Sequence, residues 1–198
     1  MDGVGALSLK ALVVPEDPVN DGFILQPLVE RMLAECGRPR AKVKVLDKPR
    51  PQGYDHAKTL LRTQLFERYR FMNLFLFLPD SDGRDRSAEF QSLEREAEGS
   101  GIRLICCAAI HVVETWLLAG HLDRLEERRW QDVRSDLSVK KNVFAPFLAR
   151  YGNPKAPGGG RDLLMAKTLS GYSSLLKRCP ELAELERRIR EALGTEQG

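Results

Sequence analysis

Apolar residues recur at two different spacings along the first 110 positions of the chain. Four segments rich in β-branched, aromatic and other apolar side chains are typical of strands: residues 7–14, 41–47, 72–78 and 102–108. Between these strands, apolar positions repeat at the helical spacing in three segments: residues 21–35, 55–69 and 87–98. Strands that alternate with helices favour parallel pairing. We therefore expect an α/β fold with a mostly parallel, Rossmann-like sheet flanked by helices.

Two of these strands differ in their expected surroundings. Residues 72–78 are apolar except for Asn73, which indicates a strand buried on both faces. Residues 41–47 alternate strictly, and Lys42 and Lys44 on the wet face indicate an edge strand, where charge blocks further pairing. For the first helix, Asn20 or Asp21 is the expected N-terminal cap.

The pattern becomes helical after residue 109. Helices are expected in five segments: residues 111–119, 122–130, 143–151, 161–169 and 181–193. This change divides the chain into an α/β domain at residues 1–120 and a helical extension at residues 121–198 that packs on it. The net charge of +3 is the sum of −1 in the first part and +4 in the second. A basic excess beside an acidic site suits a polyanionic substrate, although a solvated helical surface accounts for it equally well.

Composition narrows the class of protein. No apolar run is long enough to span a bilayer, and the first residues do not combine a basic segment with a long apolar one. The four cysteines form no CxxC pair and no zinc-type spacing. We therefore expect a cytoplasmic protein with free thiols and no membrane partner.

Carboxylates follow several of the predicted strands at the point where each strand ends. Glu16 follows the first strand, Asp80 and Asp82 follow the third, and Glu114 lies beyond the fourth. The carboxyl ends of parallel strands share one edge of a sheet, so these side chains are expected to meet there. Carboxylate oxygens are the ligands that Mg²⁺ or Mn²⁺ prefers, and the sequence thus predicts a divalent-metal site for phosphate chemistry.

Each carboxylate also has a simpler interpretation. Glu16 favours the positive end of the helix that follows it, and Asp80 and Asp82 occur among Ser and Gly, which are turn residues. Glu114 suits an exposed helix position. Their joint placement at strand ends favours the metal site.

The acidic residues and the segment Glu114-Thr115-Trp116-Leu117-Leu118-Ala119 together resemble the Toprim (topoisomerase–primase) superfamily. The likeness is greatest to its small stand-alone members, related to the OLD-type and RloB-like proteins of bacterial anti-phage defence. The resemblance implies a metal-dependent nuclease, a hydrolase of phosphodiesters. Asp80 and Asp82 would hold Mg²⁺, Glu16 would be general base or second ligand, and Glu114 would complete the cluster. The chain departs from the family pattern at Asp17, where a glycine is usual.

Basic residues supply candidates for holding phosphate. These are Arg84 just past the Asp pair, Lys155 and Arg161 on either side of a triple glycine, and Lys167 in the helix beyond. The expected partner is nucleic acid, with DNA and RNA both open, and a homodimer is also open. One alternative is a non-catalytic Toprim-like module that binds or regulates an ATPase partner. Another is a glycosyltransferase that holds a nucleotide-sugar through Mn²⁺.

Overall fold

The computed structural model describes residues 8–194 and contains one four-stranded sheet, all of whose strands are parallel. The strands pair in the order β2-β1-β3-β4. Their bounds are Lys10–Val14 for β1, Lys42–Val45 for β2, Leu74–Phe77 for β3 and Leu104–Cys106 for β4. The expected α/β fold with a parallel, Rossmann-like sheet is confirmed, as is the edge position of residues 42–45. Residue 7, the start of the first expected strand, lies outside the described residues.

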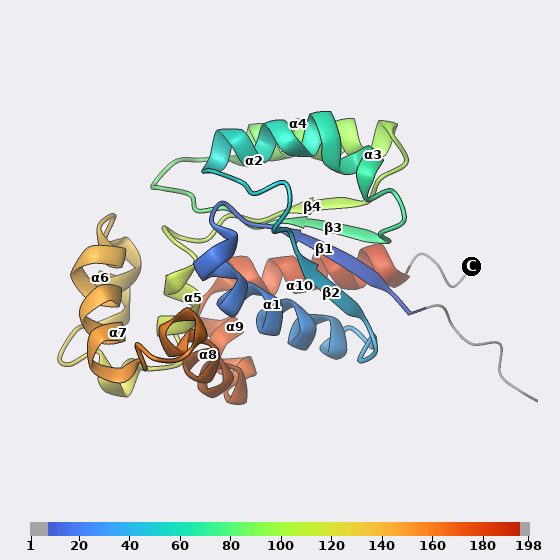
Figure 1. The fold of residues 1–198 in the computed structure, drawn as a ribbon. Helices are drawn as coiled ribbons and strands as arrows, with labels where there is room; N and C mark the ends of the chain where they lie inside the picture. The colour runs from blue at the N-terminus through green and yellow to red at the C-terminus, as the bar shows by residue number, and fades with distance from the viewer. Residues whose placement is uncertain (1–7, 195–198) are drawn as a thin grey trace, which may run out of the picture.

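The two faces of the sheet carry separate cores because successive strand residues point to opposite sides. On β1, Ala11 and Val13 join one core, whereas Leu12 and Val14 join the other. The first core is covered by α1 (Pro18–Glu35) and by helices of the carboxyl-terminal part of the chain, and the second by the layer that contains α2 and α4 (Figure 1). All four residues of β3 are buried, as its uninterrupted apolar run predicts.

The helices of the α/β part follow the expected segments closely. The predicted helix at residues 55–69 is one continuous helical stretch, in which α2 (Tyr54–Leu60) passes through a π-helical turn, η1 (Leu61–Leu65), into α3 (Phe66–Arg68). Helix α4 spans Ser87–Gly99.

The predicted cap of the first helix is wrong. Asp17 caps α1 and accepts a hydrogen bond from Val19 N at 3.0 Å. The helix can begin three residues earlier than expected because Pro18 lies at its first position, where a missing N–H does no harm.

Beyond residue 113 the chain is helical. The elements in order are α5 (Glu114–Leu118), η2 (Leu122–Arg124), α6 (Trp130–Ser135), η3 (Lys140–Phe144), α7 (Ala145–Tyr151), η4 (Pro157–Gly160), α8 (Arg161–Ser170), α9 (Tyr172–Arg178) and α10 (Pro180–Gly194). The predicted helix at residues 122–130 is wrong, since only a short 3₁₀ turn forms before Glu126 adopts a φ of 58°. A positive φ at a residue with a Cβ interrupts a right-handed helix. Helices α6 and α9 are additions to the expected set.

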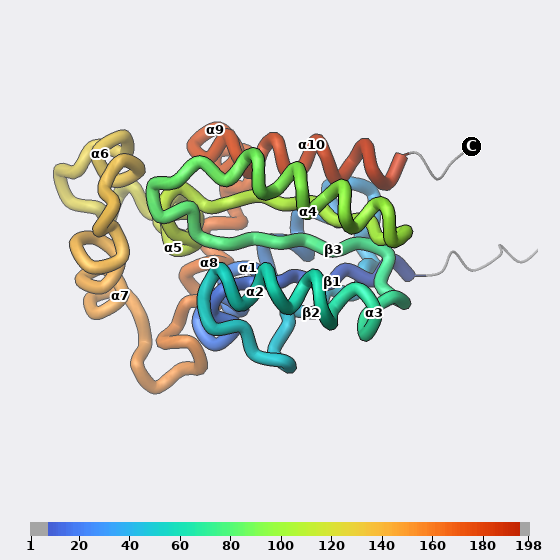
Figure 2. Tube along the Cα trace, turned by 90° about the horizontal axis from the view of Figure 1, so that it is seen from above, coloured from blue at the N-terminus to red at the C-terminus, as the bar shows by residue number. Residues whose placement is uncertain are grey.

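Several of these helices return to the sheet. Helix α8 runs against α1, and α10 lies against α1 and β4 (Figure 1). Helices α5, α6 and α7 group beyond one end of the strands, and the described chain begins and ends near the other (Figure 2). Among residues 8–194, no helix is both long enough and apolar enough to cross a membrane.

A polar junction joins α5, α6 and α10. Glu181 accepts a hydrogen bond from Trp116 Nε1 at 2.9 Å, and Arg134 binds the same carboxylate through both terminal nitrogens, at 3.1 and 2.9 Å. A planar guanidinium on a carboxylate is a directional pair, so the junction fixes how the three helices meet.

Candidate functional site

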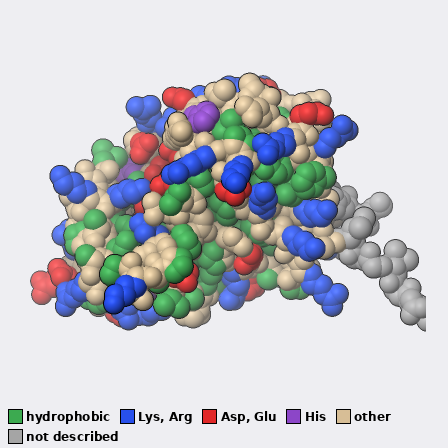
Figure 3. Space-filling view, in the orientation of Figure 1, with side chains coloured by type: hydrophobic (Ala, Val, Ile, Leu, Met, Phe, Trp, Pro, Cys, Tyr) green, Lys and Arg blue, Asp and Glu red, His purple; other side chains and the backbone are tan. Residues whose placement is uncertain are grey.

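The carboxyl ends of β1 and β3 bring Glu16 and Asp80 into contact. Asp80 N donates a hydrogen bond to Glu16 Oε1 at 3.1 Å, across 64 positions of sequence. This pairing follows from the register of the sheet, in which Val14 lies opposite Phe77, so the loops that follow the two strands leave side by side. Acidic side chains are visible at this end of the molecule, between the upper helices and the α6–α7 lobe (Figure 3).

The loop after β3 is held by the loop after β4. Ser81 N donates to the carbonyl oxygens of Ala109 and His111, at 3.0 and 3.1 Å, and Asp82 N donates to His111 O at 3.2 Å. Asp80 Oδ1 accepts from Val113 N at 2.8 Å. Asp82 has a φ of 50°, and its side chain is exposed at the mouth of the site. Backbone hydrogen bonds therefore fix the loop, and the Asp82 carboxylate remains exposed to solvent.

Glu114 begins α5 directly after Val113 and lies in the interior. Its side chain is 1% exposed, and its Oε1 lies 2.9 Å from Lys140 Nζ of η3. The ion pair supplies Oε1 with an opposite charge, whereas Oε2 has no hydrogen-bond partner among the described residues. A buried carboxylate oxygen without such a partner is costly, which suggests that this position serves more than packing.

Asp21 joins the cluster, although the sequence suggested only a cap. It lies in the first turn of α1, is 4% exposed, and accepts a hydrogen bond from Asp17 N at 3.2 Å. Asp21 precedes Leu25 and Leu28 by four and seven positions, so it continues the apolar face of the helix. That spacing is the signal that could have identified a carboxylate directed into the protein.

Burial and mutual repulsion alter the acidity of three of these groups. Burial, followed by the charges of Asp80 and Asp82, raises the pKa of Glu16 to about 7. Burial, with Glu114 and Asp80 nearby, raises the pKa of Asp21 to about 8. The pKa of Asp80 rises to about 7, chiefly through burial. Carboxylates that disfavour one another's charge in this way form a region that attracts a cation.

Lys140 supplies part of the opposing charge. Burial alone would lower the pKa of its ammonium, but Glu114, Asp21 and Asp80 together raise it. The lysine is therefore a protonated counter-ion for the cluster, contributed by the helical extension to a site built on the sheet.

The donor set can be tested against a divalent cation. The groups are hard oxygen donors, two of them are almost fully buried, and Oε2 of Glu114 has no hydrogen-bond partner among the described residues. This chemistry fits Mg²⁺ or Mn²⁺, which prefer carboxylate oxygens. As the side chains stand, no group of three or more His, Cys, Asp or Glu residues within the described range surrounds a common point. The side chains therefore have the right chemical type for a divalent cation, but their oxygens do not converge on one point to form a complete set of ligands.

Of the four residues predicted to hold phosphate, Arg84 lies nearest in the chain to the acidic loop. It is exposed and lines a hollow of about 380 Å³ together with Ser81, Arg86 and His111. His111, which lies shortly before α5 in the chain, therefore lies next to the loop that carries Asp80 and Asp82.

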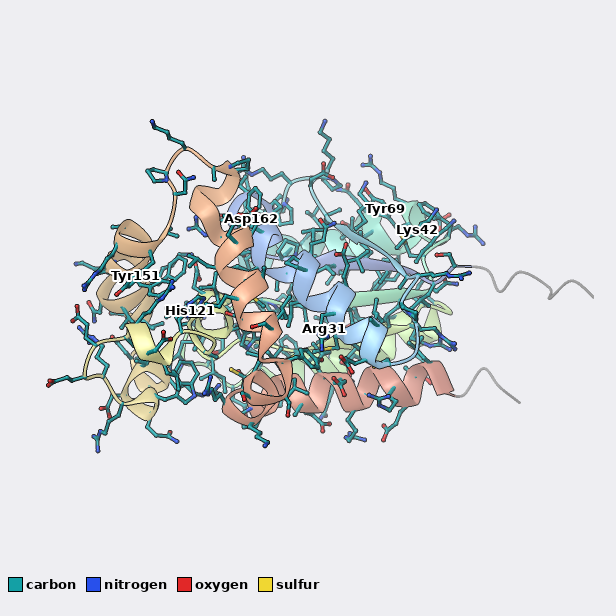
Figure 4. The ribbon with its side chains drawn as sticks, turned by 90° about the horizontal axis from the view of Figure 1, so that it is seen from below. Arg31, Lys42, Tyr69, His121, Tyr151 and Asp162 are labelled. Carbon is teal, nitrogen blue, oxygen red and sulfur yellow. The ribbon has the colours of Figure 1, made fainter. Side chains whose placement is uncertain are left out.

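The other three lie in the α7–α8 region. Lys155 is exposed in the connecting loop, and Arg161 donates a hydrogen bond to Gly158 O at 2.7 Å while lying over Phe144. Lys167 forms an ion pair with Asp123 at 3.3 Å. It lines a separate hollow of about 260 Å³ with His121 and Tyr151, which lie toward α7 in Figure 4.

Comparisons of the chain with protein families, with curated proteins and with solved structures find no match in any of the three.

Proposed function

We propose that this protein is a divalent-metal-dependent phosphodiesterase, a nuclease of the Toprim-like type. The observation that carries the proposal is the meeting of Glu16, Asp21, Asp80 and Glu114 at the carboxyl edge of a parallel sheet, with pKa values raised at three of them. Open α/β sheets bind their ligands at this edge. The fold supports this proposal at the level of a Rossmann-like sheet.

Asp80 and Asp82 would hold Mg²⁺ or Mn²⁺, with Glu114 or Asp21 as a further oxygen donor. When bound, a divalent cation neutralises charge on a phosphoryl oxygen and makes nearby water more acidic. The protein's own part is to gather the carboxylates and to keep their charges from being fully solvated. Asp82, exposed at the mouth, is the carboxylate that an incoming phosphate meets first.

Glu16 suits the role of general base. Burial raises the pKa of this carboxylate above its ordinary value, which makes it a better proton acceptor than a solvated glutamate. Water adds to phosphorus, its proton passes to Glu16, and the bond from phosphorus to the leaving oxygen breaks. The hydrogen bond from Asp80 N to Oε1 orients Glu16 and leaves Oε2 for the water.

Thermal unfolding across a Mg²⁺ and Mn²⁺ titration tests the proposal first. A ligand that binds only the folded state raises the Tm. We expect stabilisation in the wild type and none in Asp80→Asn/Asp82→Asn, with loss of nucleic-acid cleavage in the same variant. The matched control is Asp47→Asn/Asp55→Asn, which removes two exposed carboxylates and should retain both properties. Equal stabilisation of the wild type and the Asp80/Asp82 variant would contradict the assigned ligands.

One observation favours a second candidate, a non-catalytic binding module. Lys140 already neutralises Glu114, and the acidic residues do not surround a common point among the described residues. A protein that had lost its metal would need such an internal counter-ion. Under this alternative, which the sequence links to an ATPase partner, metal ions leave the Tm unchanged and the Asp80/Asp82 variant keeps its function.

A further inference from the structure

A hollow opens beside the acidic cluster, between the loop after β3, the start of α4 and the loop after β4. Its volume is about 380 Å³. Its polar lining comes from Ser81, Arg84, Asp85, Arg86, Ser87 and His111. The hollow and the acidic cluster share the loop after β3, because Asp82 lies between Ser81 and Gly83, which both line the hollow.

Two residues that line this hollow each carry a buried nitrogen without a hydrogen-bond partner among the described residues. The two nitrogens are Nε of Arg86, whose side chain is 8% exposed, and Nδ1 of His111. Buried polar atoms in folded proteins are nearly always hydrogen-bonded, so two orphans on one hollow point to a missing ligand. Both nitrogens belong to groups that bind oxygen, one of them permanently cationic.

The position of Arg86 is fixed before any ligand arrives. Its guanidinium lies 3.7 Å from the centre of the Tyr54 ring, and its NH1 lies 3.6 Å from a carboxylate oxygen of Glu89. An arginine stacked on an aromatic ring keeps its planar fork in one orientation and loses little freedom on binding. Its charge also reaches the acidic site, where it opposes the increase in the pKa of Glu16.

The charge of the hollow selects an anion. The two acids beside Arg84 and Arg86 are already engaged: Asp85 accepts hydrogen bonds from the Ser87 backbone N–H, at 2.9 Å, and hydroxyl, and Glu89 accepts one from Lys58 Nζ at 2.8 Å. The hollow also lies at the N-terminus of α4, a 13-residue helix whose dipole favours negative charge. An oxyanion with several acceptor oxygens satisfies the guanidinium, the helix end and the imidazole together.

We propose that this hollow binds a phosphate group of the substrate strand, next to the phosphate that is cleaved. The inference rests on the proposed function for the identity of the ligand, while the hollow itself consists of residues outside the acidic cluster. Arg84 and Arg86 hold the phosphate oxygens, and His111 Nδ1 completes the contacts. The arrangement places a phosphodiester backbone across the loop that carries Asp82.

Binding in the absence of metal tests the inference. The full-length protein in EDTA is titrated by calorimetry with pyrophosphate and, separately, with a six-nucleotide single strand as DNA and as RNA. We expect both kinds of ligand to bind and the strand to bind more tightly. Arg84→Gln and Arg86→Gln should each weaken binding by about tenfold, as the loss of a charge-assisted hydrogen bond implies. Arg95→Gln, on the exposed face of the same helix, is the matched control and should bind as the wild type does.

The His111 ring provides a second readout that does not depend on the Arg86 variant folding. Its ¹⁵N resonances should shift on addition of pyrophosphate in the wild type, and the shift should require higher concentrations in Arg84→Gln. Failure of the wild type to bind pyrophosphate and strands overturns the inference, as does equal affinity in Arg84→Gln and Arg95→Gln. A different result would contradict the proposed function, namely a Tm that does not change when metal ions are added. Binding of pyrophosphate without binding of either strand would show a site for free phosphate and would also overturn the inference.

Discussion

Lys140 Nζ lies 2.9 Å from Oε1 of Glu114, and the glutamate side chain is 1% exposed. The lysine belongs to the helical extension and the glutamate to the end of the α/β part, so this ion pair joins the two at the acidic site. About half of the lysine side chain remains exposed, at 53%. Glu114 is thus the buried member of the pair, and Lys140 is the member that solvent reaches.

We predict that Lys140→Met destabilises the protein. Removal of one partner of a buried pair leaves the other charge uncompensated, which costs several kcal/mol when both groups are buried. Because Lys140 is half exposed, a loss of about 1 to 2 kcal/mol is expected. Urea unfolding at pH 8 in EDTA measures it. Lys141→Met, at the neighbouring exposed position, is the control, and Lys140→Met/Glu114→Gln should regain most of the loss. An additive double variant would show that the two groups do not interact.

We predict that Asp21→Asn stabilises the metal-free protein, and more so at high pH. The folded-state pKa of about 8 lies above the ordinary value of 3.8, so ionisation of Asp21 opposes folding. The stability of the wild type therefore falls as pH rises from about 4 to about 8 through this group. The variant lacks this loss, and its advantage should grow by about 4 kcal/mol between pH 5 and pH 8.5.

Thermal unfolding in EDTA at the two pH values measures the difference. Asp55→Asn removes a carboxylate whose side chain is 91% exposed and should show no such change with pH. An advantage for Asp21→Asn that is the same at both pH values would refute the buried, repelled state of this carboxylate.

Gly120 permits the close approach of α5 to α8. A Cβ at Gly120 would lie 2.4 Å from Thr168 Cα, a backbone atom that cannot move alone. Gly120→Ala should therefore destabilise the protein by about 1 to 3 kcal/mol, the usual cost of overpacking. Gly99→Ala is the matched control, because a Cβ there meets nothing within 4 Å, and a gain of about 0.4 to 1 kcal/mol is expected. Denaturant midpoints compare the two, and equal effects would contradict the close packing.

Arg134→Met should loosen the junction of α5, α6 and α10. The change removes both hydrogen bonds from the guanidinium to Glu181 and leaves that carboxylate, which is 12% exposed, with Trp116 alone. A loss of about 2 to 3 kcal/mol is expected, with a shift of the Trp116 fluorescence as its indole environment changes. Arg129→Met is the control, because Arg129 is 82% exposed and pairs only locally with Asp132. An unchanged midpoint for Arg134→Met would rule out this junction as a source of stability.

The sheet was predictable because its signals are local. The run at residues 74–78 has no polar interruption on either face, and the lysines of residues 42–45 mark an edge by charge alone. Glu16 and Asp80 could be brought together from the strand-end rule without knowledge of any side chain. The predicted helix at residues 122–130 failed for a different reason, since the φ of 58° at Glu126 depends on how the following helices pack.

The remaining members of the site depend on tertiary contacts. Asp21 resembles a cap in sequence, and although its spacing continues the apolar face of α1, only the folded protein shows that it joins the other carboxylates. Lys140 lies 26 positions after Glu114, and no spacing rule connects a lysine in one helix with a glutamate in another. The orphan nitrogens of Arg86 and His111 likewise become visible only when the two loops are placed side by side.

The core beneath the sheet contains residues from β1 and from α10, whose bounds are Lys10–Val14 and Pro180–Gly194. During synthesis, β1 and α1 leave the ribosome long before α10. Until α10 has been made, the apolar side chains of α1 and β4 on that face lack one of their covers. The core on this face of the sheet therefore closes only once Pro180–Gly194 has been added.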